Sequence, residues 1–163
     1  MATMAGGAEA TIARRRVRGA SVAVVLALAG GGIVVTGTWL PWMSYFAGLV
    51  PLRGLIGFNG RVLLAAGVLG VVLGSAAMWS SEPRVLRIAR RTSGFIGLGV
   101  AAAAVWLLIG VHQLTRVHMS NAMLVPRAGI GLVVVFIGGC MLAVAAAVAS
   151  ATRPEPRAAS AAD

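Results

Sequence analysis

Charged residues divide this chain into alternating polar and apolar stretches, and four of the apolar stretches are long. The uncharged intervals run from Gly19 to Leu52, Val62 to Ser81, Thr92 to Thr115 and Ala128 to Thr152. A helix needs about 20 residues to cross a hydrocarbon core roughly 30 Å thick, and ionised side chains are costly at that depth. Each interval therefore predicts one transmembrane helix.

The first interval is too long for one crossing, because at about 1.5 Å per residue it would make a helix longer than the bilayer core is thick. Pro41, Pro51 and several glycines predict a loop in its second half. We expect helices over about residues 19–38, 60–80, 93–114 and 128–150, an aromatic outer loop over 39–59 and a basic inner loop over 81–92. The predicted fold class is all-α, an integral membrane four-helix bundle made of two transmembrane hairpins.

The chain has three expected parts: a basic segment over residues 1–18, the transmembrane domain over 19–150 and a disordered tail over 151–163. Within the first part, residues 1–13 are expected to be loose. The basic residues before the first apolar run resemble a secretory signal. That run exceeds the usual signal core and no Ala-x-Ala site follows it, so a retained first span is favoured.

The distribution of arginine predicts the orientation of the spans. One side receives ten arginines, namely Arg14, Arg15, Arg16, Arg18, Arg84, Arg87, Arg90, Arg91, Arg153 and Arg157. The other side receives Arg53, Arg61, Arg116 and Arg127. Basic residues concentrate in cytoplasmic segments of membrane proteins, so both termini are expected in the cytoplasm of a cell with the protein in its plasma membrane.

Composition supports a membrane protein and argues against nucleic acid as a partner. With 163 residues the chain makes one domain, and 59% of its residues are hydrophobic against 11% charged. The formal net charge of +10 comes from arginines at the ends of apolar segments, so we interpret it as topogenic. Abundant Ala, Gly, Val and Arg without Lys indicates a GC-rich bacterial genome, with an actinobacterium favoured. Cys140 is the single cysteine and cannot form an intramolecular disulfide.

The two halves of the chain are faintly alike. The segment from Leu49 to Gly57 leads into the second helix much as the segment from Leu124 to Gly131 opens the fourth. Such similarity arises from duplication of a helical hairpin or, in a sequence this rich in small residues, from chance. The sequence leaves both origins open.

The second helix carries small residues at four-residue spacing: Ala66, Gly70 and Gly74. Because lipid is as apolar as the helices, association inside a membrane depends on close van der Waals packing, which small residues permit. Packing inside the four-helix bundle is the favoured interpretation of this strip. Docking on another subunit, or self-association, is the alternative.

The outer loop contains more than half of the aromatic residues of the chain. They are Trp39, Trp42, Tyr45, Phe46 and Phe58, and the basic residues Arg53 and Arg61 accompany them. Trp and Tyr favour membrane interfaces, so an anchor on the outer leaflet is one interpretation. The other is a contact surface for a partner or lipid, since aromatic and Arg side chains together bind apolar and anionic groups.

The inner loop holds a second group of basic residues: Arg84, Arg87, Arg90 and Arg91. Ser81, Glu82 and Pro83 form a plausible helix start before them, and the intervening apolar residues give a short amphipathic segment. We expect these arginines to contact anionic lipids of the inner leaflet, each contributing about 1 kcal/mol. A solvated loop that sets topology, or docking on an acidic partner, are the alternatives.

A family resemblance rests on two short motifs. Trp39-Leu40-Pro41-Trp42 closes the first span and Gly57-Phe58-Asn59-Gly60-Arg61 opens the second. Together they resemble small four-span membrane proteins of actinobacteria. The resemblance covers about the first half of the chain and implies four-span topology, with no activity, cofactor or site residue attached to it.

The residues that catalysis would need are not arranged for it in the sequence. His112 and His118 are six positions apart, which predicts different helix faces, and no Cys or carboxylate stands near them, so no metal or other cofactor is expected. The four apolar intervals contain no ionisable Asp, Glu, Lys or Arg, which disfavours proton-coupled transport. We expect a non-catalytic accessory or scaffold subunit of a membrane or cell-envelope complex. A small oligomeric channel or carrier is the alternative, and an enzyme acting on lipids is a third hypothesis.

Overall fold

Four long helices make up most of the computed structural model, which describes residues 3–45, 50–80, 82–117 and 127–151. The helices are α1 (Thr3–Trp39), α2 (Phe58–Trp79), α3 (Pro83–Val117) and α4 (Ile130–Ala151). Each is long and apolar enough to cross a membrane over part or all of its length, namely Ser21–Trp39, Phe58–Trp79, Arg84–Leu114 and Ile130–Ala151. The prediction of four helices of membrane-spanning length is confirmed.

Two helices are longer than the apolar pattern predicts. The expectation of a loose segment over residues 1–13 is wrong for its described part, because α1 begins at Thr3. The segment is rich in Ala and leads directly into Arg14, Arg15 and Arg16, and both residue types favour helix. The predicted helix start at Ser81, Glu82 and Pro83 is confirmed, because α3 begins at Pro83, where a missing backbone donor is tolerated. The helix then continues without a break through most of the inner loop expected over 81–92 into the span. The backbone N–H of Glu82 donates to the Ser80 hydroxyl at 3.3 Å in the short connection that remains.

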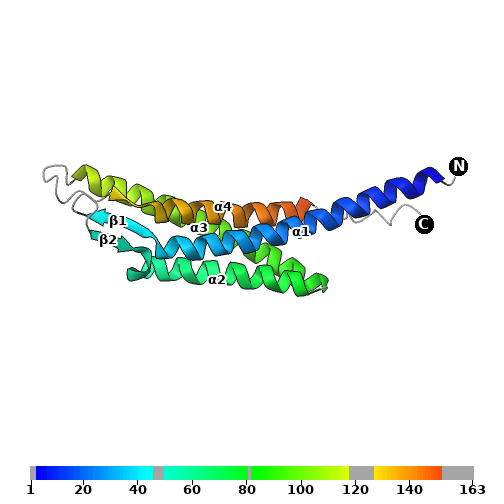
Figure 1. Ribbon diagram of the computed structural model, residues 1–163, viewed down its shortest axis with the longest axis horizontal. Helices are drawn as coiled ribbons and strands as arrows, with labels where there is room; N and C mark the ends of the chain where they lie inside the picture. Colours follow the sequence, from blue (N-terminus) through cyan, green and yellow to red (C-terminus); the bar gives the residue numbers. More distant parts are fainter. Residues whose placement is uncertain (1–2, 46–49, 81, 118–126, 152–163) are drawn as a thin grey trace, which may run out of the picture.

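The bundle has two distinct ends (Figure 1). We call the end with the strands the sheet end, and the end with the α2–α3 connection the hairpin end. Helix α1 packs against both α2 and α4, and α3 packs against α4, whereas contact between α2 and α3 is much sparser. The N-terminal part of α1 extends past the other helices at the hairpin end.

Facing glycines bring the helix backbones together in the three extensive interfaces. A Cβ atom built on Gly30 would lie 2.9 Å from the Gly138 carbonyl oxygen of α4, and one on Gly31 would lie 2.9 Å from the Gly67 carbonyl oxygen of α2. Between α3 and α4, a Cβ on Gly97 would lie 2.8 Å from the Gly139 carbonyl oxygen. Close backbone approach of this kind is the main source of helix association in lipid. The largest fully buried side chains include Leu132, Leu142, Val34 and Val135.

A small sheet stands where the sequence predicts an irregular outer loop. It consists of β1 (Pro41–Tyr45), β2 (Val50–Arg53) and β3 (Arg127–Ala128) in the order β2-β1-β3, with both pairings antiparallel. A short 3-10 helix, η2 (Gly54–Ile56), connects β2 toward α2. The two faintly similar segments of the chain thus supply the two strands that flank β1. The pairing of β1 with β3 joins residues far apart in sequence, so local pattern gives no sign of it.

Candidate functional site

Trp42 is the central residue of the sheet end. In the β1–β2 register Pro41 pairs with Arg53 and Met43 pairs with Leu52, so Trp42 falls at an irregularity between two pairs. An extra residue of this kind bends a strand and redirects its side chain. The indole is only 7% exposed, and its Nε1 donates a hydrogen bond to the Gly37 carbonyl oxygen at 3.0 Å.

Glycines from two distant segments make room for the Trp42 ring. A Cβ atom on Gly54 would overlap the indole, and one on Gly131 would lie 2.6 Å from its Cδ1 atom. The backbone N–H of Gly129 also donates to the Trp42 carbonyl oxygen at 2.7 Å. Trp42 therefore holds together the end of α1, the η2 segment and the start of α4. Sequence reasoning missed these glycines, although Gly54 and Gly131 both lie in the two similar segments.

The expectation that Trp42 contacts a partner or lipid is wrong for this structure, because the side chain is enclosed by the chain itself. The physical reason is the bulge, which turns Trp42 inward while Trp39, three residues earlier, stays 60% exposed. Tyr45 lies in β1, but its side chain falls outside the described residues, as does Phe46 entirely.

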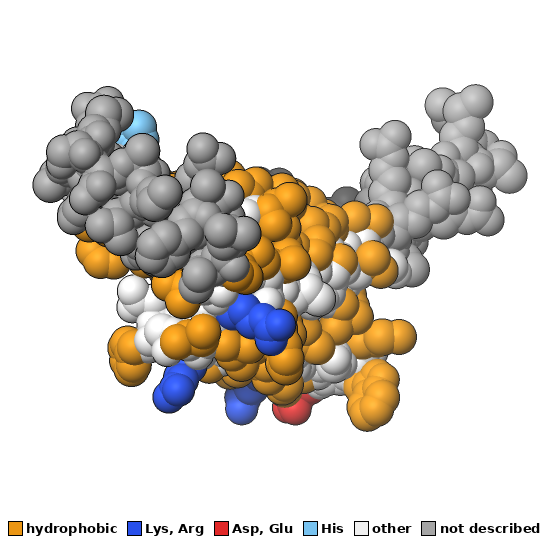
Figure 2. Space-filling view, turned by 60° about the vertical axis from the view of Figure 1, so that its left-hand side comes forward, with side chains coloured by type: hydrophobic (Ala, Val, Ile, Leu, Met, Phe, Trp, Pro, Cys, Tyr) orange, Lys and Arg blue, Asp and Glu red, His pale blue; other side chains and the backbone are white. Residues whose placement is uncertain are grey.

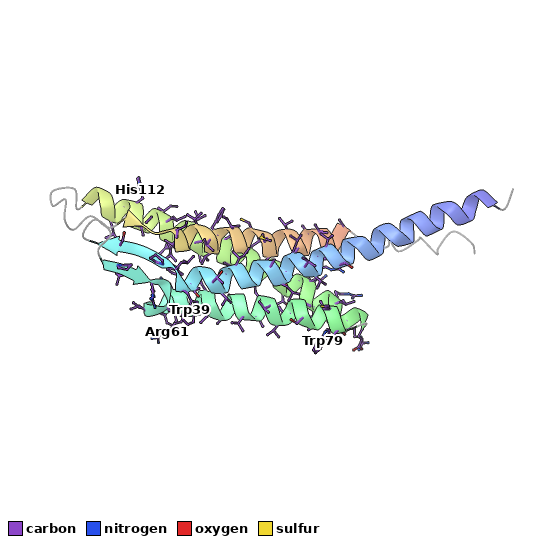
Figure 3. All side chains as sticks on the ribbon, viewed as in Figure 1. Trp39, Arg61, Trp79 and His112 are labelled. Atoms are coloured by element: carbon purple, nitrogen blue, oxygen red, sulfur yellow. The ribbon has the colours of Figure 1, made fainter. Side chains whose placement is uncertain are left out.

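Large apolar and basic side chains share the exposed side of the sheet end. Trp39 is 60%, Ile56 68% and Phe58 80% exposed, and Arg53 and Arg61 are exposed as well. Figure 2 shows basic side chains set among hydrophobic ones on this face, and Figure 3 places Trp39 and Arg61 at the same end of the bundle. We call these five residues the sheet-end surface. Sequence reasoning named all of them except Ile56, which carries no distinguishing motif.

A hollow of about 340 Å³ adjoins the sheet-end surface. Its lining includes Trp42, Arg53, Ile56 and Phe58, and Leu107 of α3 closes one side. The buried Trp42 and three of the five residues of the sheet-end surface, Arg53, Ile56 and Phe58, therefore line the same hollow. The surface is mounted on a packed base and is not a free loop.

The predicted packing strip on α2 faces the interior of the bundle. Gly74 lies against Leu28 of α1, with an added Cβ 3.1 Å from the Leu28 Cδ2 atom, and Gly70 lies against Leu142 of α4. Ala66 packs against the buried core. The strip is therefore used within the chain, as the favoured interpretation of the sequence has it.

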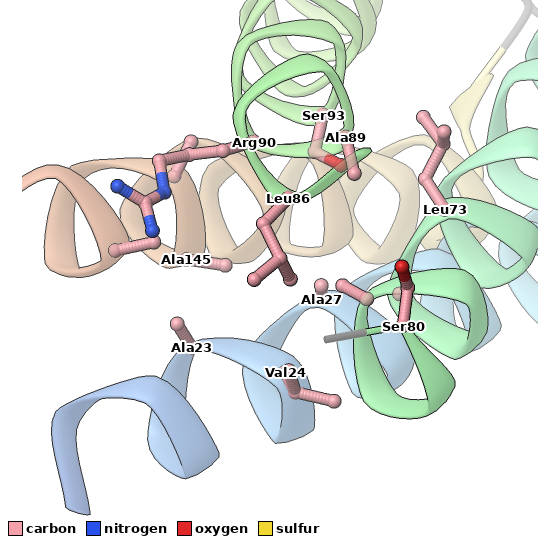
Figure 4. A pocket seen from close by; sticks show the side chains of 14 residues that line it. Ala23, Val24, Ala27, Leu73, Ser80, Leu86, Ala89, Arg90, Ser93 and Ala145 are labelled. Carbon is pink, nitrogen blue, oxygen red and sulfur yellow. The ribbon is translucent and has the colours of Figure 1, made fainter. Parts of the chain in front are cut away.

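The four basic residues at the start of α3 separate into two groups. Arg84, Arg87 and Arg91 are exposed, which suits contact with lipid headgroups. Arg90 is half-buried and lines a cavity at the hairpin end together with residues of all four helices (Figure 4). Its position on the inward side of α3 follows from helical periodicity, with Leu86, Ala89 and Ser93 on the same side.

The described residues include no group of three or more His, Cys, Asp or Glu side chains that could hold a metal ion. His112 is exposed near the end of α3, and His118 falls outside the described residues. Cys140 is a free, half-buried thiol in α4. These side chains do not converge on one another in the part of the chain that the structure describes.

Comparison with family models, with curated proteins and with solved structures finds no match for this chain.

Proposed function

We propose that this chain is an integral protein of a bacterial plasma membrane with both termini in the cytoplasm. Four helices of membrane-spanning length support the insertion. The excess of arginine near the hairpin end and the termini supports the orientation, since cytoplasmic segments are enriched in basic residues. In this orientation the sheet end faces outward.

Within that membrane we propose a non-catalytic role, as an accessory or scaffold subunit that docks on another membrane protein through the sheet-end surface. The observation that carries this proposal is the exposure of Trp39, Ile56 and Phe58 beside two arginines, on a base fixed by the buried Trp42. Aromatic and Arg side chains contribute most of the binding energy in many interfaces. A surface that is already rigid loses little conformational entropy when it binds.

The alternative use of these side chains is to anchor the sheet end in the headgroup region of the bilayer. Trp79 offers a matched comparison, because it is 88% exposed at the hairpin end and would meet the opposite interface. An anchoring role predicts that Trp39 and Trp79 behave alike when truncated. A docking role predicts that only Trp39 matters to partner binding.

The test is purification of the full chain from its native membrane in mild detergent, followed by mass spectrometry of co-purifying proteins. We expect a stable companion with the unaltered chain, and at least a tenfold loss of it when Trp39→Ala and Phe58→Ala are combined. The Trp79→Ala variant should retain the companion. Membrane extraction of all variants should require detergent, which shows that insertion is unaffected.

Two outcomes would contradict the docking role. One is a lone chain without any stable companion, and the other is equal retention of the companion by the Trp39→Ala, Phe58→Ala double variant. Solute flux through liposomes that contain only this chain would support the channel or carrier alternative instead.

A further inference from the structure

The hairpin end contains an apolar cavity of about 200 Å³ between the four helices. Most of its lining consists of small or apolar residues, among them Ala27, Leu73, Ala77, Leu86 and Ala145. Its lining runs from Leu73 in α2 to Ser80, the residue that follows this helix, which corresponds to about 10 Å along the bundle at 1.5 Å per residue. The cavity therefore extends inward from the hairpin end.

The polar part of this lining is small and includes a cation. Arg90 lines the cavity with Ser80 and the buried Ser93, whose exposure is 6%. Figure 4 shows Leu86 directed into the space between α3 and α1, while the Arg90 side chain extends to one side of Leu86 and its guanidinium lies over α4. The Arg87 side chain is exposed one turn before Arg90 on α3, so a second positive charge is close by. The site combines an apolar interior with positive charge at its edge.

We propose that this cavity binds one acyl chain of an anionic phospholipid whose phosphate group lies at Arg90. An apolar cavity of about 150 Å³ accepts a molecule the size of benzene, so this one has room for a short stretch of hydrocarbon. Arg is well suited to phosphate, because its planar guanidinium can donate two parallel hydrogen bonds. An arginine beside hydrocarbon extends its charged group toward the headgroup region, which places that charge at the depth of lipid phosphates.

Van der Waals contact gives a lipid chain of the bilayer a reason to occupy the cavity. An empty apolar space leaves its lining atoms without van der Waals partners, whereas a lipid chain restores those contacts. Leu73 and Ala77 of α2 and Leu86 of α3 line the cavity. Contact between these two helices is sparse, and their described glycines do not face one another. The inference rests on the proposed membrane insertion, but it requires neither the accessory role nor a particular orientation.

The experiment measures lipid binding to the detergent-purified full chain by native mass spectrometry. The probes are palmitoyl-oleoyl phosphatidylglycerol, which is anionic, and palmitoyl-oleoyl phosphatidylcholine, which has no net charge. We expect the first phosphatidylglycerol molecule to bind at least tenfold more tightly than phosphatidylcholine. A phosphatidylglycerol with a photoreactive group in its acyl chain should label residues of the cavity lining.

Two pairs of variants separate the cavity from the general surface. Ala77→Leu fills the cavity from α2 and should weaken phosphatidylglycerol binding at least tenfold, whereas Ala65→Leu on the exposed side of the same helix should leave it unchanged. Arg90→Gln should remove the preference for phosphatidylglycerol. Arg91→Gln, at an exposed position where an arginine contributes about 1 kcal/mol to contact with anionic headgroups, should weaken that preference by about fivefold at most and leave the photolabelling of the cavity lining in place.

Each result decides the proposal. Equal binding of the two lipids, unaltered binding by Ala77→Leu, or photolabelling confined to lipid-facing positions such as Ala65 would overturn it. Helix content and elution volume show whether each variant folds, and the photolabelling of the unaltered chain decides the matter if a variant does not. A chain that alkaline carbonate releases from membranes would contradict the insertion itself, whereas an inserted chain without lipid preference contradicts only the lipid site.

Discussion

Three consecutive glycines of α1 meet three different surroundings, and alanine at each should therefore give a different result. An added Cβ at Gly30 would lie 2.9 Å from the Gly138 carbonyl oxygen and 3.0 Å from the Leu142 backbone nitrogen, both in α4. One at Gly31 would lie 2.9 Å from the Gly67 carbonyl oxygen in α2. One at Gly32 would have no atom of another segment within 4 Å.

The expected magnitudes follow from these distances. Gly32→Ala should raise the free energy of unfolding by about 1 kcal/mol, because Ala favours helix over Gly by about that amount and nothing obstructs the methyl group. Inserting a methyl group into a packed interface costs about 1–3 kcal/mol. At Gly30 and Gly31 the obstructing atoms include backbone, which cannot rotate away, so the cost should be near the upper limit. After the gain in helix preference, each substitution should lower the unfolding free energy by about 2 kcal/mol.

The assay is equilibrium unfolding in mixed detergent micelles, followed by the loss of helical circular dichroism as the fraction of denaturing detergent rises. The three variants differ from one another only in the position of one methyl group within three residues. Their common chemistry removes any general effect of Gly→Ala on the unfolded chain, so the differences report on packing. The separation between Gly32→Ala and the other two variants should be about 3 kcal/mol.

Equal shifts in the unfolding free energy of the three variants, or the largest loss in Gly32→Ala, would contradict the close packing at Gly30 and Gly31. A loss at Gly30 with none at Gly31 would mean that the α1–α4 interface is as described and the α1–α2 interface is looser than the structure has it. Gly30→Ala tests the α1–α4 interface and Gly31→Ala tests the α1–α2 interface, so the two interfaces are tested separately.

Two further predictions concern the sheet end and the orientation. Trp42→Ala should lower the unfolding free energy by about 3–5 kcal/mol and speed hydrogen exchange at the Gly129 amide, whereas Trp39→Ala should lower the unfolding free energy by less than about 1 kcal/mol. Equal losses of stability in thermal unfolding would contradict the buried position of Trp42. The orientation can be tested with single cysteines in a Cys140→Ser background, because the exposed residues Asn59 and Glu82 lie at opposite ends of the bundle. Asn59→Cys should react with an impermeant maleimide in intact cells, and Glu82→Cys should react only after permeabilisation. The reverse pattern would show that the termini face outward.

The four helices could be predicted because exclusion of charge is a local property that each interval shows by itself. The N-terminal ends of α1 and α3 could not be predicted in this way, because hydropathy marks where a helix lies in lipid and not where it begins in polar sequence. The helix of α1 continues in polar sequence back to Thr3. The predicted helix start at Pro83 leads in one unbroken helix into the span, where the sequence predicted a separate short amphipathic segment. The helix-favouring residues outside the apolar intervals indicate these extensions, but a prediction based on the charge pattern does not take them into account.

The candidate site was predictable in composition and not in geometry. Trp39 and Trp42 are the same residue type three positions apart, yet one is 60% and the other 7% exposed. What separates them is the irregularity between Pro41 and Met43 and the space left by Gly54 and Gly131, which come from other parts of the chain. The sequence around Trp39 and Trp42 alone therefore does not show which of the two side chains is buried.

The placement of glycine explains both where the bundle is closed and where it is open. Gly30, Gly31 and Gly97 each bring α1 or α3 into backbone contact with a neighbour, and the interfaces they form are the extensive ones. No described glycine does the same between α2 and α3, and both cavities include residues from these two helices. The larger adjoins the sheet-end surface, and the other contains Arg90. Since packed interfaces resist deformation and loosely contacting ones do not, binding at either end of this bundle should be accommodated by movement of α2 relative to α3 while α1 and α4 stay together.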